Sequence, residues 1–460
     1  MAATWDQRDP DEQARVRDRL LADWLPTVVA AAPFWGALAE ASGIAAADAG
    51  DLGTLRRLPT VRETELLAGG DRGSSAVVAP TEDEVRAHAP ATTIRRLTAG
   101  IGRRGAAGRR DLLLHEYQPL LLQRAGSDGS WWVASSRSDL DRMHRAGARS
   151  AAVAGVDPSD VLVSAVRCGP TLHHLGMVHL AAGASITAAH PRTDAGYAEV
   201  VDAIRALSPT VLAVAADEVD ALADALRAAR VTTAGLRRLL VLGPPPDEAR
   251  RKALAGAFTD GDSGVPVLAL WGPTESRVLW AECAPASGLH TYPDLEHLEV
   301  VDPFTGAPTE ADGDLTLTSL GWHGTALVRY RTGAWVEPLV TGACPGCGRT
   351  LPRLGGTIEP SAWQLPFRTG ADVGTVDLRG VASVLSRAPG VVDWRVEVVA
   401  AENGDHLRVE VAGGLGEDGH ELRDRLAQAC GMVPEVRLGV APDEIAAGIE
   451  RVGGVFADLR

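Results

Sequence analysis

The chain has 460 residues and a mass of 48.1 kDa, too long for one small hydrophobic core, so we expect at least two lobes. Hydrophobic residues make up 45% and charged residues 23%, as in ordinary globular proteins, and the net charge of -15 argues against a general affinity for nucleic acid or anionic membranes. No apolar run reaches bilayer length and the polar N-terminus does not resemble a signal peptide, which predicts a cytoplasmic enzyme or binding protein.

The first part of the chain predicts a helix over residues 11–31, because its apolar residues recur at helical spacing until Pro33 interrupts the pattern. From about residue 150 to 275, short apolar strands alternate with alanine-rich helices. This alternation predicts βαβ units around a mostly parallel sheet. We expect strands at 161–166, 210–214, 239–242 and 265–270, and helices at 197–207 and 217–229.

The pattern changes after residue 296, where residues 298–301 and 314–318 predict a β-hairpin region. The last hundred residues predict a further αβ unit, with helices at 376–386 and 417–429 and strands at 394–399, 407–411 and 435–438. We therefore predict an α/β protein with a large N-terminal domain (1–356), containing mixed or parallel sheets and the hairpins, and a small α+β C-terminal lobe (357–460).

Two residue types limit the chemistry. The one lysine is Lys252, which excludes any mechanism that needs a catalytic lysine elsewhere. Five cysteines are too few for a disulfide framework, and the C-x2-C spacing of Cys344 and Cys347 favours a metal over a disulfide in a cytoplasmic chain.

Five motifs in the same order resemble the adenylate-forming enzymes, and in particular the phenylacetate–CoA ligase branch. Residues 270–275 (LWGPTE) look like the aromatic-Gly-x-Thr/Ser-Glu motif, 313–320 (GDLTLTSL) like the "GELxxTxL" strand, and 327–333 (LVRYRTG) like "RYRTGD". The cysteine turn with residues 348–355, and the N-terminal PFW and LPT stretches at 33–35 and 58–60, are similar to the phenylacetate–CoA ligase branch. The likeness spans essentially the whole chain.

The resemblance implies a two-step reaction in which a carboxylate attacks ATP to give an acyl-adenylate, and a thiol, usually of coenzyme A, then captures the acyl group. Such chemistry needs backbone N–H groups for phosphates, a magnesium-binding carboxylate, an acid on the ribose and a lysine. The resemblance implies that Thr274 and Glu275 are catalytic, with Glu275 binding magnesium, and that Trp271, Gly272 and Arg331 lie at the cofactor; a solvated acidic loop is the alternative for Glu275.

Several ATP-handling positions depart from the family pattern. Ala334 stands where the family has the ribose-binding aspartate, and losing a charged acceptor costs roughly 1.5–3 kcal/mol. The phosphate loop aligns with residues 125–130, where Gly126, Ser127 and Gly129 surround Asp128, a charge that repels phosphate. An ordinary surface turn is the alternative there, and the basic Gly-rich run 98–105 is a rival alignment. The "GRxDD" acids are missing at 357–363, and no lysine lies in 450–460.

The resemblance also implies a zinc site and a substrate pocket. Cys283, His290, Cys344 and Cys347 would form a Cys3His structural site that clamps the hairpin region to the main sheet; the alternative is four unrelated residues, with Cys283 a buried apolar side chain. His173 and His174 fall where the family lines its acyl pocket, as a contact or base, although capping or packing is the alternative. Trp271 and Trp335 would line the same cleft.

Three functions follow. With three of four ATP functions missing or damaged, we expect Mg-ATP binding to be impaired. We favour ATP-independent transfer of an aryl or acyl group between thioesters of coenzyme A or a carrier protein in a biosynthetic pathway. The alternatives are a catalytically silent scaffold that partners an active enzyme, and an active aryl or acyl–CoA ligase whose nucleotide site is rebuilt with arginines. The ligands would be an aryl or acyl small molecule or thioester, with a homodimer as in many relatives.

Overall fold

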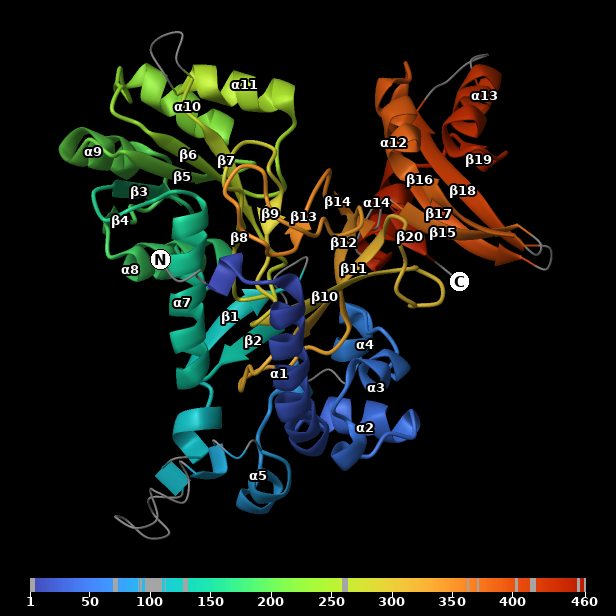
Figure 1. Ribbon diagram of the computed structural model, residues 1–460. Helices are drawn as coiled ribbons and strands as arrows, with labels where there is room; N and C mark the ends of the chain where they lie inside the picture. The colour runs from blue at the N-terminus through green and yellow to red at the C-terminus, as the bar shows by residue number, and fades with distance from the viewer. Residues whose placement is uncertain are drawn as a thin grey trace. The chain divides into compact units, whose positions relative to one another are not determined.

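The computed structural model describes residues 5–458 except 69–72, 90, 92, 96–109, 112, 127–130, 259–263, 362–363, 370–371, 402–403, 414–418 and 453–455. The chain divides into two compact units (Figure 1). The first unit comprises Met1–Asp302, Gly306–Thr332 and Val336–Ile358, and the second comprises Pro303–Thr305, Gly333–Trp335 and Glu359–Arg460.

The first unit is built on an eight-stranded sheet in the order β13-β9-β8-β7-β6-β5-β3-β4. Its parallel part comprises β3 (Val161–Ala165), β4 (Thr187–Ala189), β5 (Val211–Ala215), β6 (Arg238–Leu242) and β7 (Val267–Trp271). The antiparallel edge comprises β8 (Trp280–Ala281), β9 (Leu289–His290) and β13 (Arg353–Leu354). Nearly every residue of the central parallel strands is apolar and buried, as expected for a sheet covered on both faces.

Helices cover both faces of this sheet (Figure 1). Because side chains alternate along a strand, Leu162 belongs to one core and its neighbour Val163 to the other. The first core includes α7 (Arg137–Val153) and α8 (Leu172–Ala184). The second includes α9 (Ala198–Leu207), α10 (Val219–Ala228) and α11 (Glu248–Ala257). The result is a three-layer α/β/α arrangement.

The topology favours a ligand-binding position at the carboxyl ends of the parallel strands. The chain leaves β3 through α8 on one face, and β4 through α9 on the other, so the winding reverses between β3 and β5. In open α/β sheets, ligands bind outside the carboxyl ends of the strands at such a switch point. The loops after β3, β5 and β7 are therefore the expected positions of a ligand site.

The rest of the first unit adds helices and hairpins. The N-terminal helices are α1 (Pro10–Ala31), α2 (Pro33–Ala41), α3 (Leu52–Arg57), α4 (Glu63–Leu67) and α5 (Glu82–His88). The hairpin of β1 (Leu121–Ala125) and β2 (Trp131–Ser135) precedes α7, and β10 (Glu296–Val301) pairs antiparallel with β11 (Gly313–Ser319). In the described part of the chain no single helix is long and apolar enough to cross a membrane, and α1 and α2 pass that test only as a pair bent by 98°.

The second unit contains a separate sheet in the order β16-β15-β18-β17-β20, with β19 on β18. Its strands are β15 (Gln364–Thr369), β16 (Asp372–Asp377), β17 (Val391–Ala401), β18 (Gly404–Gly413), β19 (Glu435–Leu438) and β20 (Phe456–Asp458), and its helices are α12 (Leu378–Arg387), α13 (Gly419–Cys430) and α14 (Pro442–Val452). In this unit Ala334 and Trp335 of β12 (Tyr330–Val336) also pair with β14 (Glu359–Pro360).

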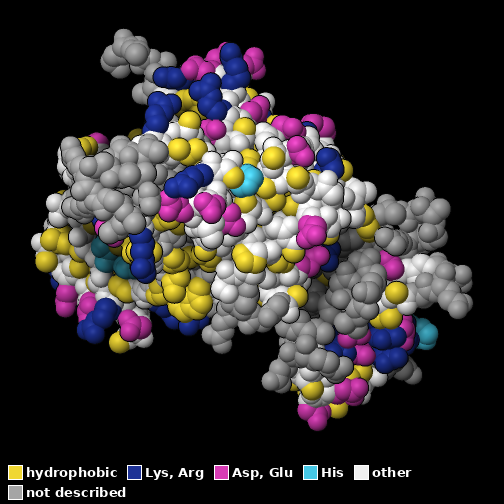
Figure 2. All heavy atoms as spheres, turned by 90° about the horizontal axis from the view of Figure 1, so that it is seen from below, with side chains coloured by type: hydrophobic (Ala, Val, Ile, Leu, Met, Phe, Trp, Pro, Cys, Tyr) yellow, Lys and Arg dark blue, Asp and Glu magenta, His cyan; other side chains and the backbone are white. Residues whose placement is uncertain are grey.

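The predicted elements are present, with shifted ends. The α/β class with a smaller α+β C-terminal part is confirmed. Pro33 ends the first helix as expected, but it also starts α2, because proline fits the first turn of a helix. The helix predicted from Val376 begins at Leu378, because Val376 pairs with Leu365 in the β15–β16 hairpin and Asp377 caps the helix. On the face drawn in Figure 2, the coloured acidic and basic side chains are intermixed.

Candidate functional site

The candidate site lies at the carboxyl edge of the parallel strands. β7 runs directly into Thr274 and Glu275, and β3 leads through residues 166–171 into α8, which starts with Leu172 and the two histidines His173 and His174. The side chain of Thr171 caps α8 by accepting from the backbone N–H of His174. The βα topology, not proximity in sequence, brings these residues to one edge.

The β1–β2 hairpin docks on this edge. The backbone N–H of Arg124 donates to the carbonyl of Pro170 (2.6 Å), and the side-chain amide of Gln123 donates to the carbonyl of Thr274. At the turn, the backbone N–H of Gly126 donates to Thr274 Oγ1 (3.1 Å) and to Glu275 Oε1 (3.2 Å). The structure thus brings together three of the predicted site residues, while Ser127, Asp128 and Gly129, like the rival loop 98–105, lie outside the described residues.

Gly126 is required by the geometry of this turn. Its φ of +88° lies in the left-handed region, and a Cβ there would lie 2.1 Å from Glu63 Oε1 and 2.8 Å from Cδ1 of the buried Trp131. The Trp131 ring also lies against Tyr330, with centroids 6.2 Å apart. A large indole therefore packs tightly over Gly126 of the candidate phosphate loop.

Glu275 is a buried carboxyl group with internal donors. It is 3% exposed, and Tyr330 donates its hydroxyl to Glu275 Oε1 (3.1 Å), the same oxygen that accepts from Gly126. Burial, together with the nearby Glu63 carboxylate, raises the pKa of Glu275 to about 7. Burial and the Glu275 carboxylate in turn raise the pKa of Tyr330, so its phenol stays protonated as a donor. Sequence reasoning missed Tyr330, although it lies inside the RYRTG motif.

The other predicted cofactor residues have structural partners. Trp271 ends β7 with its ring edge-on to Trp280 at 5.5 Å. A Cβ on Gly272 would lie 2.6 Å from the carbonyl oxygen of Val278, so only glycine fits there. Arg331 is paired with Asp314 (2.9 Å) and donates to Thr60 Oγ1 (2.8 Å). A nucleotide role for Trp271, Gly272 and Arg331 stays a prediction, as does a cleft role for Trp335, a residue of the second unit.

The two histidines differ in their surroundings. Burial lowers the pKa of His173, and Asp217 opposes that shift. Burial also lowers the pKa of His174, whose ring packs edge-on against His190 with centroids 5.5 Å apart. The Nδ1 atoms of His174 and His190 are buried and have no hydrogen-bond partner among the described residues. The imidazoles of His173 and His174 are therefore neutral at pH 7 and able to accept a proton.

Sequence reasoning also missed Cys168 and His190. Cys168 follows β3, and its exposed thiol lies 3.6 Å from the carbonyl oxygen of His190, the residue that directly follows β4. The signal that could have found them is their position just past parallel strands. Burial raises the pKa of Cys168, with Asp194 adding to the shift, so it is a thiol rather than a thiolate at pH 7.

The four predicted metal ligands converge at the antiparallel edge of the main sheet. The ligand atoms of Cys283, His290, Cys344 and Cys347 all lie within 4.8 Å of one another. The Cys283 and Cys344 sulfurs are 3.6 Å apart, as are Cys347 Sγ and His290 Nε2. Zinc bonds of about 2.3 Å to sulfur and about 2.0 Å to nitrogen place tetrahedral ligand atoms about 3.5–3.8 Å apart. The donor set and spacing fit a structural zinc.

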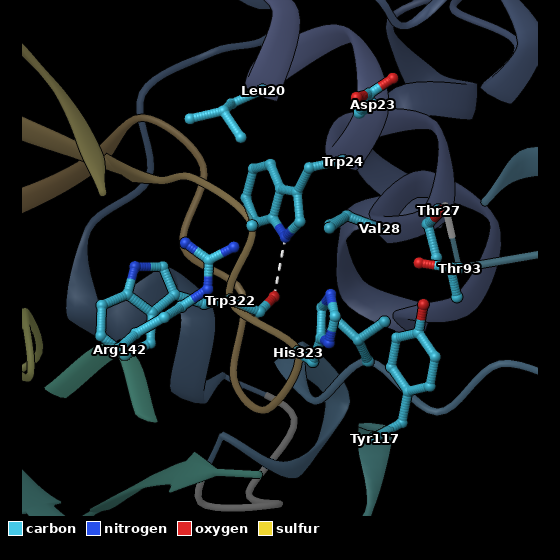
Figure 3. A pocket seen from close by; sticks show the side chains of 12 residues that line it. Leu20, Asp23, Trp24, Thr27, Val28, Thr93, Tyr117, Arg142, Trp322 and His323 are labelled. Carbon is cyan, nitrogen blue, oxygen red and sulfur yellow. Dashed lines mark hydrogen bonds between the residues drawn. The ribbon is translucent and has the colours of Figure 1, made fainter. Parts of the chain in front are cut away.

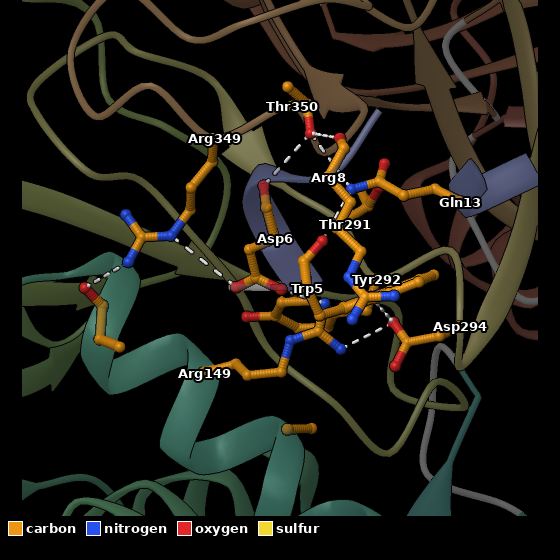
Figure 4. A network of polar contacts seen from close by, with 12 residues as sticks. Trp5, Asp6, Arg8, Gln13, Arg149, Thr291, Tyr292, Asp294, Arg349 and Thr350 are labelled. Atoms are coloured by element: carbon orange, nitrogen blue, oxygen red, sulfur yellow. Dashed lines mark hydrogen bonds and ion pairs between the residues drawn. The ribbon is translucent and has the colours of Figure 1, made fainter. Parts of the chain in front are cut away.

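A polar network connects the turn after these cysteines to the N-terminal segment (Figure 4). Asp6 pairs with Arg149 of α7 at 2.7 Å and with Arg349 at 3.8 Å, and Arg149 also pairs with Asp294 at 2.7 Å. Thr350 donates its backbone N–H to the carbonyl of Asp6 (2.9 Å). The cysteine turn therefore anchors the start of the chain as well as the sheet edge.

Comparison with known proteins identifies the fold. No protein-family model and no curated protein matches the sequence. Among solved structures, 2-hydroxyisobutyryl-CoA ligase in an open conformation with 2-HIB-AMP and CoA is similar at a TM-score of 0.66 and 18% identity, covering 96% of this chain and 90% of that one. The same ligase in the thioesterification state has a TM-score of 0.62 and 18% identity, over 98% and 91%.

The likeness covers both units of the chain and establishes the architecture. The chain has the fold of the adenylate-forming acyl-CoA ligases, a large α/β domain followed by a small C-terminal one. The resemblance read from the motifs is confirmed at this level. Assignment to the phenylacetate–CoA ligase branch stays a prediction.

Proposed function

We propose that the chain uses the ligase fold to move an acyl group from one thioester to another thiol, without forming an acyl-adenylate. The observation that supports this is the closed arrangement at the end of β7, where Gly126 and Tyr330 both donate to Glu275. In a working ligase site, the loop amides serve phosphates and the carboxylate serves magnesium.

Each of these functions is weakened for a physical reason. The N–H of Gly126 is already used by Thr274 and Glu275, so it is not available to a phosphate. Magnesium prefers ionised oxygen ligands, whereas Glu275 is half protonated near neutral pH. Ala334 further replaces the ribose acceptor, which by itself weakens nucleotide binding by about one to two orders of magnitude.

The histidines at the carboxyl edge supply the group that thioester exchange needs. We assign His174, with His173 as its neighbour, as the base that takes the proton from the incoming thiol. The thiolate attacks the thioester carbonyl, the tetrahedral intermediate collapses, and the departing thiolate takes the proton back from the imidazolium. The reaction conserves bonds and protons and needs no ATP. Coenzyme A or a carrier-protein thiol would be the donor and acceptor.

The test is an exchange assay on the full chain with benzoyl-CoA as donor and N-acetylcysteamine as acceptor, without ATP, followed by mass spectrometry. We expect acyl transfer that is lost in His174→Ala and retained in His179→Gln, a matched control on the same helix. Transfer that needs ATP and releases AMP would instead establish an active ligase. No transfer from any of a panel of aryl and acyl thioesters would favour the scaffold.

We also propose that Cys283, His290, Cys344 and Cys347 hold one structural zinc ion, which would crosslink β9 to the turn before β13. The full donor set leaves no coordination position for substrate, so the ion has no part in the transfer step. Metal analysis of the purified protein should give one zinc per chain, and Cys347→Ser should lower that ratio. An ion content below about 0.1 per chain in a folded protein would contradict the assignment.

A further inference from the structure

A pocket lies in the first unit, lined by residues other than those of the candidate site. Its volume is about 160 Å³, and it is lined by α1, α7, Tyr117 and the loop at 321–323 (Figure 3). None of the residues that line it comes from the loops after β3, β5 or β7. It is thus separate from the site proposed for acyl transfer.

The walls and volume of this pocket suit one small ring. Trp24, Val28, Val78 and Trp322 give it apolar surfaces, and the indole N–H of Trp24 is already used by the carbonyl of Trp322 (2.7 Å). A buried apolar cavity of about 150 Å³ is known to accept benzene. The space therefore matches a single six-membered ring with a small substituent.

Arg142 gives this pocket a cation that no carboxylate among the described residues contacts directly, although Asp139, Asp294 and Glu116 attract it from farther away. Its one hydrogen bond among the described residues is a long one (3.4 Å) to the carbonyl of Leu320, and no carboxylate there lies within ion-pair distance of it. The nearby Asp139 is occupied, since it accepts from the backbone N–H groups of His323 (2.8 Å) and Gly324 (2.7 Å). Burial lowers the pKa of Arg142, with Asp139 opposing, yet a guanidinium stays charged.

The loop at Gly321 leaves space for the Arg142 guanidinium because glycine has no Cβ. Gly321 has a φ of +70°, and a Cβ there would lie 2.5 Å from Arg142 Nη2. A half-buried guanidinium without a direct ion pair is costly unless an anion satisfies its donors. An anionic ligand in the pocket would meet this requirement with a charge-assisted, bidentate contact.

His323 lines the same pocket as Arg142, with one ring nitrogen already oriented. Its Nδ1 is 3.0 Å from Ser138 Oγ and 3.4 Å from Glu116 Oε2, and its ring packs against Tyr117 at 4.7 Å. With Nδ1 held by these groups, Nε2 is the ring nitrogen left for a ligand, and in the protonated ring it is a donor. Figure 3 shows His323 and Arg142 both close to the Trp24 indole.

One acidic group limits the charge of the ligand. Asp23 is an exposed lining residue of the same pocket. Its carboxylate would repel a second negative charge on the ligand, since like charges disfavour each other. The charges that face the pocket thus favour a monoanion over a dianion.

We propose that this pocket binds a small monocarboxylate, of benzoate size, with its carboxylate on Arg142 and His323 and its ring against Trp24. Such a site adds a second ligand position to the fold, and it is independent of the acyl-transfer proposal because it shares no residue with that site. The chemical class it takes is an aromatic or similarly compact free acid rather than a thioester.

The test is calorimetric titration of the full chain with benzoate, with its neutral analogue benzamide and with the dianion terephthalate. We expect benzoate to bind at least tenfold more tightly than either analogue. Arg142→Gln should weaken benzoate at least tenfold, while Arg145→Gln, which removes an exposed arginine of the same helix, and His174→Ala should leave it unchanged.

Equal binding of benzoate and benzamide, or an absence of benzoate binding to the wild-type chain at about 10 mM, would overturn the proposal. So would loss of benzoate binding in His174→Ala with no change in Arg142→Gln, because the acid would then occupy the acyl-transfer site. Thermal unfolding shows whether Arg142→Gln is folded; if it is not, the comparison of benzoate with benzamide on the wild type decides.

Discussion

Glu275 makes the stability of the first unit depend on pH in a way that can be measured. Its pKa is raised from 4.5 to about 7 in the folded chain, chiefly by burial. Below about pH 4.5 the group is protonated in both states and has no effect on the free energy of unfolding. Between about pH 4.5 and 7 the unfolded state releases its proton first, so stability falls, and above pH 7 the loss reaches about 3 kcal/mol.

The variant Glu275→Gln removes this titration and keeps an oxygen that accepts from Gly126 and Tyr330. We expect Gln and wild type to have similar stability at pH 4.5, and the Gln variant to be more stable by about 3 kcal/mol at pH 8. Urea unfolding at the two pH values, followed by tryptophan fluorescence, gives both numbers. Parallel pH profiles for the two proteins would overturn this prediction, because they would mean that the carboxylate is ionised and stabilised in the folded state.

Glu296→Gln tests whether the same pH effect appears at a buried carboxyl group outside the candidate site. Glu296 is also buried, accepts from the indole N–H of Trp280, and has a pKa raised by burial to about 8. It should show the same direction of pH effect. Because Glu296 lies on β10 rather than at the end of β7, its replacement should leave thioester exchange unchanged.

Three further predictions follow from the site. Removing zinc with a chelator should lower the melting temperature and increase hydrogen exchange in the N-terminal segment, because Thr350 and Arg349 anchor Asp6. Asp6→Asn should also increase hydrogen exchange there while the zinc content stays full, because the segment loses about 1–3 kcal/mol of anchoring free energy. Unchanged hydrogen exchange in both experiments would contradict this coupling. Exchange activity should fall as the pH drops below the lowered pKa of His174, and a rate that rises on acidification would argue against a histidine base. Cys168→Ser should keep more than about half of the exchange rate, since its pKa is raised, and an acyl adduct on Cys168 in mass spectra would show a covalent route instead.

Most of the fold could be predicted from local pattern. The apolar runs at 161–166 and 239–242 became β3 and β6 because buried parallel strands need no polar face. Element ends were less predictable, as with Val376, because strand pairing across the β15–β16 hairpin leaves no mark in the periodicity. The Cys3His cluster needed the family resemblance, since 61 residues separate Cys283 from Cys344.

The site itself depends on contacts between distant residues. Gly126 and Glu275 are 149 positions apart, and Tyr330 is 55 beyond Glu275, so neither spacing nor composition indicates their hydrogen bonds. The pocket lined by Trp24 and Trp322 is harder still to predict, since the hydrogen bond from Trp24 to Trp322 joins residues 298 positions apart. The motifs named Gly126, Thr274 and Glu275 as site residues, but only packing shows that the Glu275 carboxyl is enclosed and has internal donors.

We infer that this chain keeps the ligase fold but does not use ATP. The most direct measurement is a calorimetric titration of the purified, zinc-loaded chain with Mg-ATP, with metal analysis on the same sample. Closed contacts at Gly126 and Glu275 predict no detectable heat at about 1 mM ATP. Binding with a Kd in the micromolar range would instead make the chain an adenylate-forming ligase whose carboxylate substrate remains to be found.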